Sequence, residues 1–113
     1  MKADVILLIL LALLFFSFGI CFGQVSVVQF NSEWNESNTF DISSLKDCDK
    51  TDVVICHKPE QQKKHNIKAV PTVIVFDNGI EVVRFEANIM MQLEATHKDI
   101  QREIDKIYMA KFE

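Results

Sequence analysis

The sequence predicts a single α/β domain behind an apolar N-terminal segment. Two β-branched runs, at residues 25–30 and 52–56, are separated by a stretch long enough for a helical crossover. An Asn-Gly pair at residues 78–79 lies between two further apolar runs, and apolar side chains recur at helical spacing near the C-terminus. The expected order of elements is therefore strand, helix, strand, helix, strand, strand, helix. A chain of 113 residues has room for one such domain.

The N-terminal segment has the pattern of a secretory signal peptide. A basic start and an uncharged apolar run are followed by small residues at Cys21 and Gly23, where cleavage requires them. We therefore expect residues 1–23 to be removed on export to a periplasmic or secreted location, and residues 24–113 to form the domain. The alternative is an uncleaved membrane anchor formed by residues 5–22.

The net charge of −4 gives no support to nucleic-acid binding. The basic residues are scattered, and the only adjacent pair is Lys63-Lys64, whereas a nucleic-acid surface needs a clustered basic patch. The acidic residues are also spread as on an ordinary solvated surface, so catalysis by paired carboxylates has no support. We expect no nucleic-acid partner, and a membrane partner only if the N-terminal segment is uncleaved.

The first half of the domain is expected to form two strands and two helices. Residues 25–30 predict a strand that ends at turn-forming residues. A short helix is expected from about Glu36 to Leu45, because several residues before it can cap a helix N-terminus. Residues 52–56 predict the second strand, and Pro59 opens a short polar helix over residues 60–66.

The second half is expected to form a hairpin and a final helix. Residues 73–76 and 80–85 are the strands on either side of the Asn-Gly turn. Residues 87–94 alternate partly between apolar and polar side chains, which fits either a further extended segment or a loop over the core. Thr96 and Asp99 have the spacing of a capping box. The helix after them has an apolar stripe made of Ile100, Ile104, Ile107 and Tyr108.

The two cysteines of the expected mature chain are predicted to be free thiols. Export would allow a disulfide between Cys48 and Cys56 to persist. If residues 52–56 form a strand, however, the two residues start farther apart than the 7 Å or so that a bridge tolerates. We therefore favour two free thiols, one of them buried.

Two segments resemble thioredoxins. Residues 27–34, Val-Val-Gln-Phe-Asn-Ser-Glu-Trp, are similar to the strand and the tryptophan that lead to the thioredoxin active site. Residues 66–79 are similar to the thioredoxin segment that carries a cis-proline and the following hairpin. The resemblance covers residues 25–112 and implies a minimal thioredoxin fold, with a mixed sheet of strand order 2-1-3-4 and without the extra N-terminal strand and helix. More narrowly, the chain is similar to small exported thioredoxin-like proteins of marine bacteria and their phages.

The chain departs from thioredoxins at the chemical centre. Where the family has Cys-x-x-Cys after the tryptophan, this chain has Asn-Glu-Ser-Asn at residues 35–38, and the family's buried carboxylate falls on Gln29. Dithiol exchange needs one thiolate to attack and a second thiol to resolve the mixed disulfide. The resemblance therefore implies a domain that is not a dithiol oxidoreductase, with no catalytic residue at these positions.

The part of the thioredoxin site that the sequence keeps is the cis-proline. In the family, the residue before this proline presents its backbone N–H and C=O to an extended substrate, and such strand addition needs no cysteine. We therefore expect an extended peptide or protein partner. The alternative is that Pro71 has a purely structural role. The residues expected to bind the partner are Trp34, Asn35, Glu36, Ser37, Asn38, Val70 and Pro71.

A second hypothesis is an enzyme that uses Cys56 as a single working thiol. Cys56 ends the second expected strand and precedes a helix N-terminus, which can lower the pKa of a thiol. Neighbouring residues of a strand point to opposite faces, however, so His57 is not expected to contact the sulfur. We expect no cofactor and no metal site, because Cys56, His57, His65 and His97 lack the spaced pairs of a zinc site.

Overall fold

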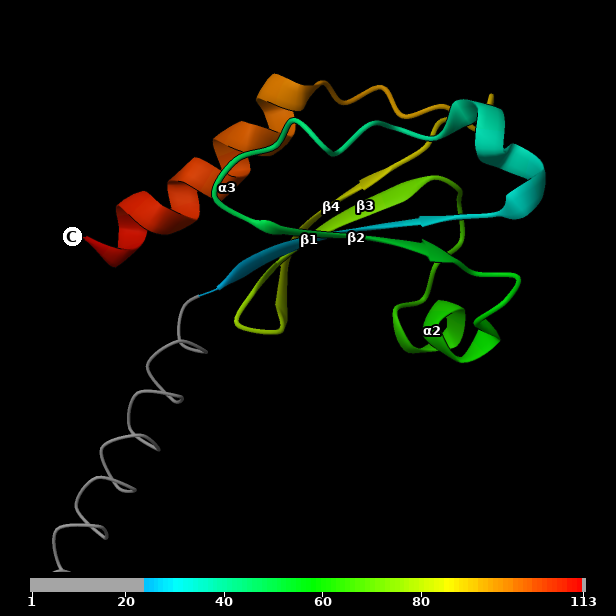
Figure 1. Ribbon diagram of the computed structural model, residues 1–113, viewed down its shortest axis with the longest axis horizontal. Coiled ribbons are helices and arrows are strands. Elements are labelled where there is room, and N and C mark those ends of the chain that lie inside the picture. The colour runs from blue at the N-terminus through cyan, green and yellow to red at the C-terminus, as the bar shows by residue number, and fades with distance from the viewer. Residues whose placement is uncertain (1–23, 113) are drawn as a thin grey trace, which may run out of the picture.

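The computed structural model describes residues 24–112, drawn in colour in Figure 1. The expected signal peptide or anchor, residues 1–23, lies outside the described residues. Within residues 24–112, none of the helices has the length and apolar character that a membrane crossing needs.

The domain is built on a mixed four-stranded sheet in the order β2-β1-β3-β4. The central strand β1 (Val25–Asn31) pairs in parallel with β2 (Asp49–Val54). On its other side β1 pairs antiparallel with β3 (Thr72–Asp77), which forms a hairpin with β4 (Ile80–Glu86). The fold class and the strand order expected from the sequence are confirmed.

The sheet is covered on both faces, so the domain has three layers (Figure 1). Helix α3 (His97–Lys111) and the connection between residues 39 and 48 lie over one face, and α2 (Pro59–Lys64) lies over the other. The core on the α3 face is made of Val25, Val27, Ile42, Leu45, Val73, Val75, Ile100, Ile104 and Ile107. The core on the α2 face is made of Phe30, Ile55, Ile67, Val70, Ile74 and Phe76. Side chains that alternate along β1 and β3 supply both cores, so these two strands carry apolar residues on both faces of the sheet.

The prediction of a helix over residues 36–45 is wrong. The structure has a short 3-10 helix, η1 (Glu33–Asn38), followed by irregular chain from residue 39 to the start of β2. The Gln29 side chain gives the physical reason, because its amide accepts a hydrogen bond from the Phe40 N–H (2.8 Å) and donates one to the Phe40 C=O (2.7 Å). Both backbone groups of Phe40 are thereby taken by a side chain and do not join a helical ladder.

Strand β2 begins and ends earlier than expected. It runs over Asp49–Val54 instead of residues 52–56, and its side chains are almost all exposed. A strand at the edge of a sheet has solvent around it and tolerates polar side chains, so Asp49, Lys50 and Thr51 do not interrupt it. Residues 55–57 consequently form a turn, which changes where Cys56 and His57 point.

The predicted hairpin and the predicted C-terminal helix are confirmed. Asn78 (φ 54°) and Gly79 (φ 81°) both have the left-handed backbone conformation that a two-residue hairpin turn requires. At the start of α3, the Thr96 hydroxyl accepts from the Asp99 N–H and the Asp99 carboxylate accepts from the Thr96 N–H, so the expected capping box is present. Of the two alternatives for residues 87–94, the structure has the irregular loop.

Lowering the pH from 7 to 5 is expected to destabilise the domain partly through His65. Its ring packs near Phe30 and Phe76, with centroid separations of 5.2 Å and 5.5 Å. Desolvation, helped by the positive charge of Lys64, lowers the pKa of His65 below its ordinary value of 6.5. The unfolded chain therefore binds the proton at a higher pH than the folded chain, and stability is lost as the pH falls below that value.

Urea unfolding at pH 7, 6 and 5 would measure this contribution. The loss of stability between pH 7 and pH 5 should be smaller in His65→Gln than in the wild type. An equal pH dependence in the wild type and His65→Gln would contradict the prediction.

Candidate functional site

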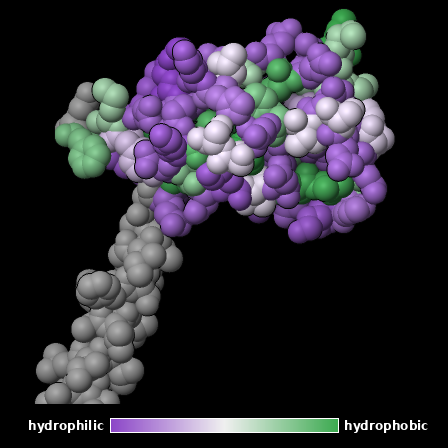
Figure 2. Space-filling view, turned by 45° about the horizontal axis from the view of Figure 1, so that its top comes forward, coloured by the Kyte–Doolittle hydropathy of each residue, from purple (hydrophilic) through white to green (hydrophobic). Residues whose placement is uncertain are grey.

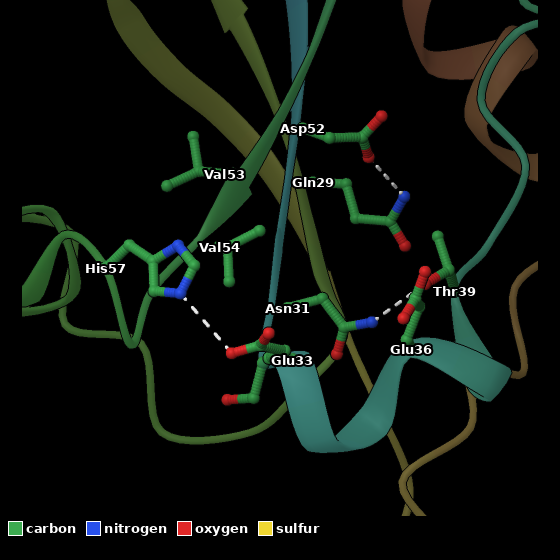
Figure 3. A pocket seen from close by; sticks show the side chains of 10 residues that line it. Gln29, Asn31, Glu33, Glu36, Thr39, Asp52, Val53, Val54 and His57 are labelled. Atoms are coloured by element: carbon green, nitrogen blue, oxygen red, sulfur yellow. Dashed lines mark hydrogen bonds and ion pairs between the residues drawn. The ribbon is translucent and has the colours of Figure 1, made fainter.

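The residues singled out from the sequence gather where β1 and β2 end and β3 begins. Two hollows meet there, and Ser32 lines both. We call the first the polar pocket, which is lined by Gln29, Asn31, Ser32, Glu33, Glu36, Thr39, Asp52, Val53, Val54 and His57 (Figure 3). We call the second the Trp34 groove, which is lined by Ser32, Trp34, Ile55, Cys56, Gln62, Ile67, Lys68 and Val70.

Asn35 is the structural centre of the site. It is 3% exposed, and its Nδ2 lies 3.2 Å from each of three acceptors: Asn31 Oδ1, the Val70 carbonyl and the Met91 carbonyl. Its Oδ1 accepts from Asn38 Nδ2 at 2.8 Å. One amide therefore joins η1 to the end of β1, to the loop before β3 and to the loop after β4. Because the amide is buried and bonded, Asn35 positions the site and has little surface to offer a partner.

The Trp34 groove is lined by Val70, the residue before the proline that precedes β3. The Val70–Pro71 peptide bond is cis, and Pro71 itself is buried. The Trp34 side chain is 65% exposed, although large apolar side chains are usually covered. Within residues 24–112, the Val70 amide nitrogen has no hydrogen-bond partner, while the Val70 carbonyl accepts from Asn35. The groove thus combines an exposed aromatic ring with a main-chain donor that is still available.

Gln29 separates the polar pocket from the core. It is 1% exposed, and its Nε2 also donates to Asp52 Oδ1 at 2.8 Å, in addition to its two bonds with Phe40 (Figure 3). All polar atoms of the side chain are therefore satisfied, by partners on β2 and on the connection after η1. A neutral amide suits this position because it must both donate and accept, which a carboxylate cannot do.

Cys56 and His57 lie side by side with Glu33 at the end of β2. The Glu33 backbone N–H points to Cys56 Sγ at 3.5 Å, and Glu33 Oε2 lies 3.3 Å from His57 Nε2 (Figure 3). One ligand atom from each of the three side chains lies within 4.8 Å of the others, and all three residues are exposed. The expectation that Cys56 and His57 point to opposite faces is wrong, because the strand ends at Val54 and the chain turns.

Cys48 is remote from this arrangement. Both thiols are free, as expected, but neither is fully buried: Cys48 is partly covered and Cys56 is exposed. Burial against the α3 face raises the pKa of the Cys48 thiol. Cys48 therefore has the character of a packing residue, and Cys56 is the accessible thiol of the described chain.

The comparisons with known proteins identify the architecture. No protein-family model matches the chain, and no curated protein matches it significantly. Among solved structures it is similar to a thioredoxin-2 described as a component of malaria parasite protein secretion machinery, at 18% identity and a TM-score of 0.61, over 74% of this chain and 84% of that one. It is also similar to the thioredoxin of Fasciola hepatica, at 19% identity and a TM-score of 0.59, over 82% of this chain and 89% of that one.

The thioredoxin of Schistosoma mansoni is similar at 24% identity and a TM-score of 0.57, over 74% of this chain and 76% of that one. The chain has a thioredoxin-like fold. At these identities the likeness establishes the fold alone. The narrower similarity to exported proteins of marine bacteria and phages stays a prediction.

The expected binding residues of this thioredoxin-like domain divide into three groups. Trp34, Glu36 and Ser37 are exposed, and Asn38 is partly exposed. Asn35, Val70 and Pro71 are buried, although Val70 lines the groove. The structure therefore brings the expected residues into one region, in which some form surface and others support it.

Three residues of the site were not predicted from the sequence. The sequence indicates Gln29 only as the position of a missing carboxylate, and it gives no indication that Glu33 pairs with His57. Glu33 is 23 residues from Cys56 along the chain, so no local spacing rule could join them. The available signal was the parallel pairing of β1 with β2, which brings the ends of the two strands together.

One face of the domain is mostly hydrophilic (Figure 2). Figure 2 shows one face of the domain on which polar side chains predominate and apolar patches are small and separate. A broad apolar interface on that face therefore has no support, whereas a narrow groove with one exposed ring suits a narrow ligand.

Proposed function

We propose that this thioredoxin-like domain is an exported, redox-inactive protein that binds an extended peptide segment in the Trp34 groove. The observation that carries the proposal is that Val70, whose amide has no partner within residues 24–112, lines the same groove as the exposed Trp34 side chain. A main-chain donor of this kind normally has a partner, so a ligand backbone is a natural one.

The chemistry of the groove fits a peptide in extended form. Strand addition takes its affinity from main-chain hydrogen bonds and its specificity from pockets for side chains. The apolar lining supplied by Ile55, Ile67 and Val70 can hold one apolar side chain, and Trp34 can cover it. Lys68 at the same groove favours an acidic or carboxyl-bearing group in the ligand.

Redox inactivity is proposed from the residues at the family's dithiol positions. Asn35 and Asn38 carry amides, and an amide neither forms a mixed disulfide nor resolves one. Export is proposed from the signal-peptide pattern of residues 1–23. An insulin disulfide-reduction assay with the purified protein should show no turnover above the uncatalysed rate.

A second candidate function is monothiol redox exchange at Cys56. It is favoured by a specific observation: Cys56 is exposed, lines the Trp34 groove and accepts a hydrogen bond from the Glu33 N–H. A thiol-trapping titration of Cys56 near neutral pH separates the two candidates. If Cys56 reacts no faster than a model thiol, monothiol exchange is excluded and peptide binding remains as the proposed function.

Peptide binding should depend strongly on Trp34. Trp34 is the single tryptophan of the chain, so its fluorescence reports directly on occupancy of the groove. Linear peptides selected from a random display library are expected to shift this emission. Trp34→Ala, measured by calorimetry, should bind them about 30-fold more weakly, which corresponds to the roughly 2 kcal/mol typical of a hot-spot residue.

Met109→Ala is the matched control, because Met109 is an equally exposed apolar side chain (66%) on α3. It should bind the selected peptides like the wild type. Equal affinities in Trp34→Ala and the wild type would refute the groove as the binding site.

A further inference from the structure

We infer that Glu33, Cys56 and His57 form a zinc-binding site at the end of β2. The inference does not depend on peptide binding. It starts from the three side chains that the turn at residues 55–57 and the start of η1 bring together, with one ligand atom of each within 4.8 Å of the others. Figure 3 shows two of them, Glu33 and His57, facing each other. No local sequence pattern indicates the site, because Glu33 is far from Cys56 and His57 along the chain.

The donor set is chemically suited to Zn²⁺. It consists of one sulfur, one imidazole nitrogen and one carboxylate oxygen, and each is a normal zinc ligand. Thiolate and imidazole together disfavour Mg²⁺ and Ca²⁺, which prefer oxygen ligands only. Three protein ligands also leave the fourth position of a tetrahedral ion open, for water or for a donor atom of a bound molecule.

The distances are compatible with a tetrahedral ion. Ligand atoms at the usual zinc bond lengths lie roughly 3.3–3.8 Å from one another. Glu33 Oε2 and His57 Nε2 are already 3.3 Å apart. The remaining separations, up to 4.8 Å, need to close by about 1 Å, which rotation of exposed side chains can supply.

The backbone that carries the ligands is well fixed. The Ile55 N–H donates to the Asn31 carbonyl at 2.9 Å, which ties the turn to the end of β1. The His57 N–H donates to the Val54 carbonyl at 3.1 Å and closes the turn itself. The ligands are thus held on two segments joined to each other, so binding needs side-chain rotation and little backbone ordering.

The Glu33 N–H gives the sulfur an outer hydrogen-bond partner. It lies 3.5 Å from Cys56 Sγ, where it can orient a metal-bound thiolate and offset its charge. Such outer donors tune metal affinity by about 10- to 100-fold. An ordinary surface ion pair between Glu33 and His57 would need neither this contact nor the nearby thiol.

Metal titration of the purified, reduced protein tests the site. Zn²⁺ is titrated in competition with a chromogenic chelator, and Co²⁺ is added separately to look for a sulfur-to-cobalt charge-transfer band, which only a thiolate ligand produces. We expect one ion per chain and a clear charge-transfer band. Cys56→Ser should abolish the band, and Cys56→Ser and His57→Gln should each weaken Zn²⁺ binding at least tenfold.

Cys48→Ser is the matched control, because Cys48 is a free thiol outside the cluster. It should keep both the band and the affinity. In addition, Zn²⁺ should slow alkylation of Cys56 without changing that of Cys48, as measured by peptide mass spectrometry. Absence of Zn²⁺ binding, or equal affinity in the wild type and Cys56→Ser, would overturn the proposal. Because the three side chains are exposed, the variants should fold, and circular dichroism would verify it.

Discussion

Replacing Gln29 with leucine is expected to lower the free energy of unfolding by about 2–4 kcal/mol. Leucine fits the volume but leaves the N–H and C=O of Phe40, and one Asp52 oxygen, without their partner. Each buried polar group that loses its hydrogen bond costs roughly 1–3 kcal/mol, and Phe40 and Asp52 lie partly in solvent, which reduces the total. For a domain of ordinary stability, this loss is a large share of the total free energy of unfolding.

The effect should be local as well as global. Gln29 is the link between the central strand and the irregular connection after η1, so hydrogen exchange should accelerate between residues 39 and 45 before it does in β1. Urea unfolding gives the free energy, and exchange mass spectrometry gives the location. Gln92→Leu, at an exposed glutamine, is the control and should change stability by less than about 0.5 kcal/mol. A Gln29→Leu protein as stable as this control would mean that the connection is held by other contacts.

The double substitution Asn35→Cys with Asn38→Cys is expected to create a functional dithiol. The two asparagine side chains already touch, with Asn38 Nδ2 at 2.8 Å from Asn35 Oδ1. Residues one turn apart in a 3-10 helix have Cα atoms about 6 Å apart, inside the range that a disulfide accepts. The variant should therefore lose both new thiols on oxidation and reduce insulin in the presence of dithiothreitol.

This gain should come with a loss of stability. Asn35 bonds to two carbonyl groups and to Asn31, and a cysteine replaces none of these bonds well, so a cost of about 1–3 kcal/mol is expected. Each single cysteine variant is a control, because one thiol cannot complete the exchange. If the double variant forms its disulfide but stays inactive, the missing cysteines are not the sole reason for the inactivity that we propose.

The sheet could be predicted from the sequence because its signals are local. β1 is rich in β-branched residues, β3 contains a four-residue apolar run, and the Asn78-Gly79 pair fixes the register of the hairpin between β3 and β4. The helix α3 was equally clear, since its capping box and its apolar stripe both lie within a few turns. Hydrophobic periodicity and turn-forming residues are therefore sufficient to predict these elements.

The elements that were predicted wrongly depend on distant partners. The connection after η1 has residues that could form a helix, and it is kept irregular by Gln29, 11 residues before Phe40. β2 starts earlier than its apolar residues because pairing with β1, and not side-chain burial, defines an edge strand. The same limit applies to the site: the cluster of Glu33, Cys56 and His57 exists only because that pairing aligns the two strand ends.

The path of β1 through the middle of the sheet separates the start of the described chain from the site. Gln24 is held at one end of the sheet by the Asn78 N–H at 3.1 Å, and Asn31 reaches the site at the other end. The strand between them rises by about 20 Å. The Trp34 groove and the Cys56 thiol therefore lie at the end of the sheet opposite to Gln24 and the hairpin turn, so a partner can reach them without passing the start of the described chain.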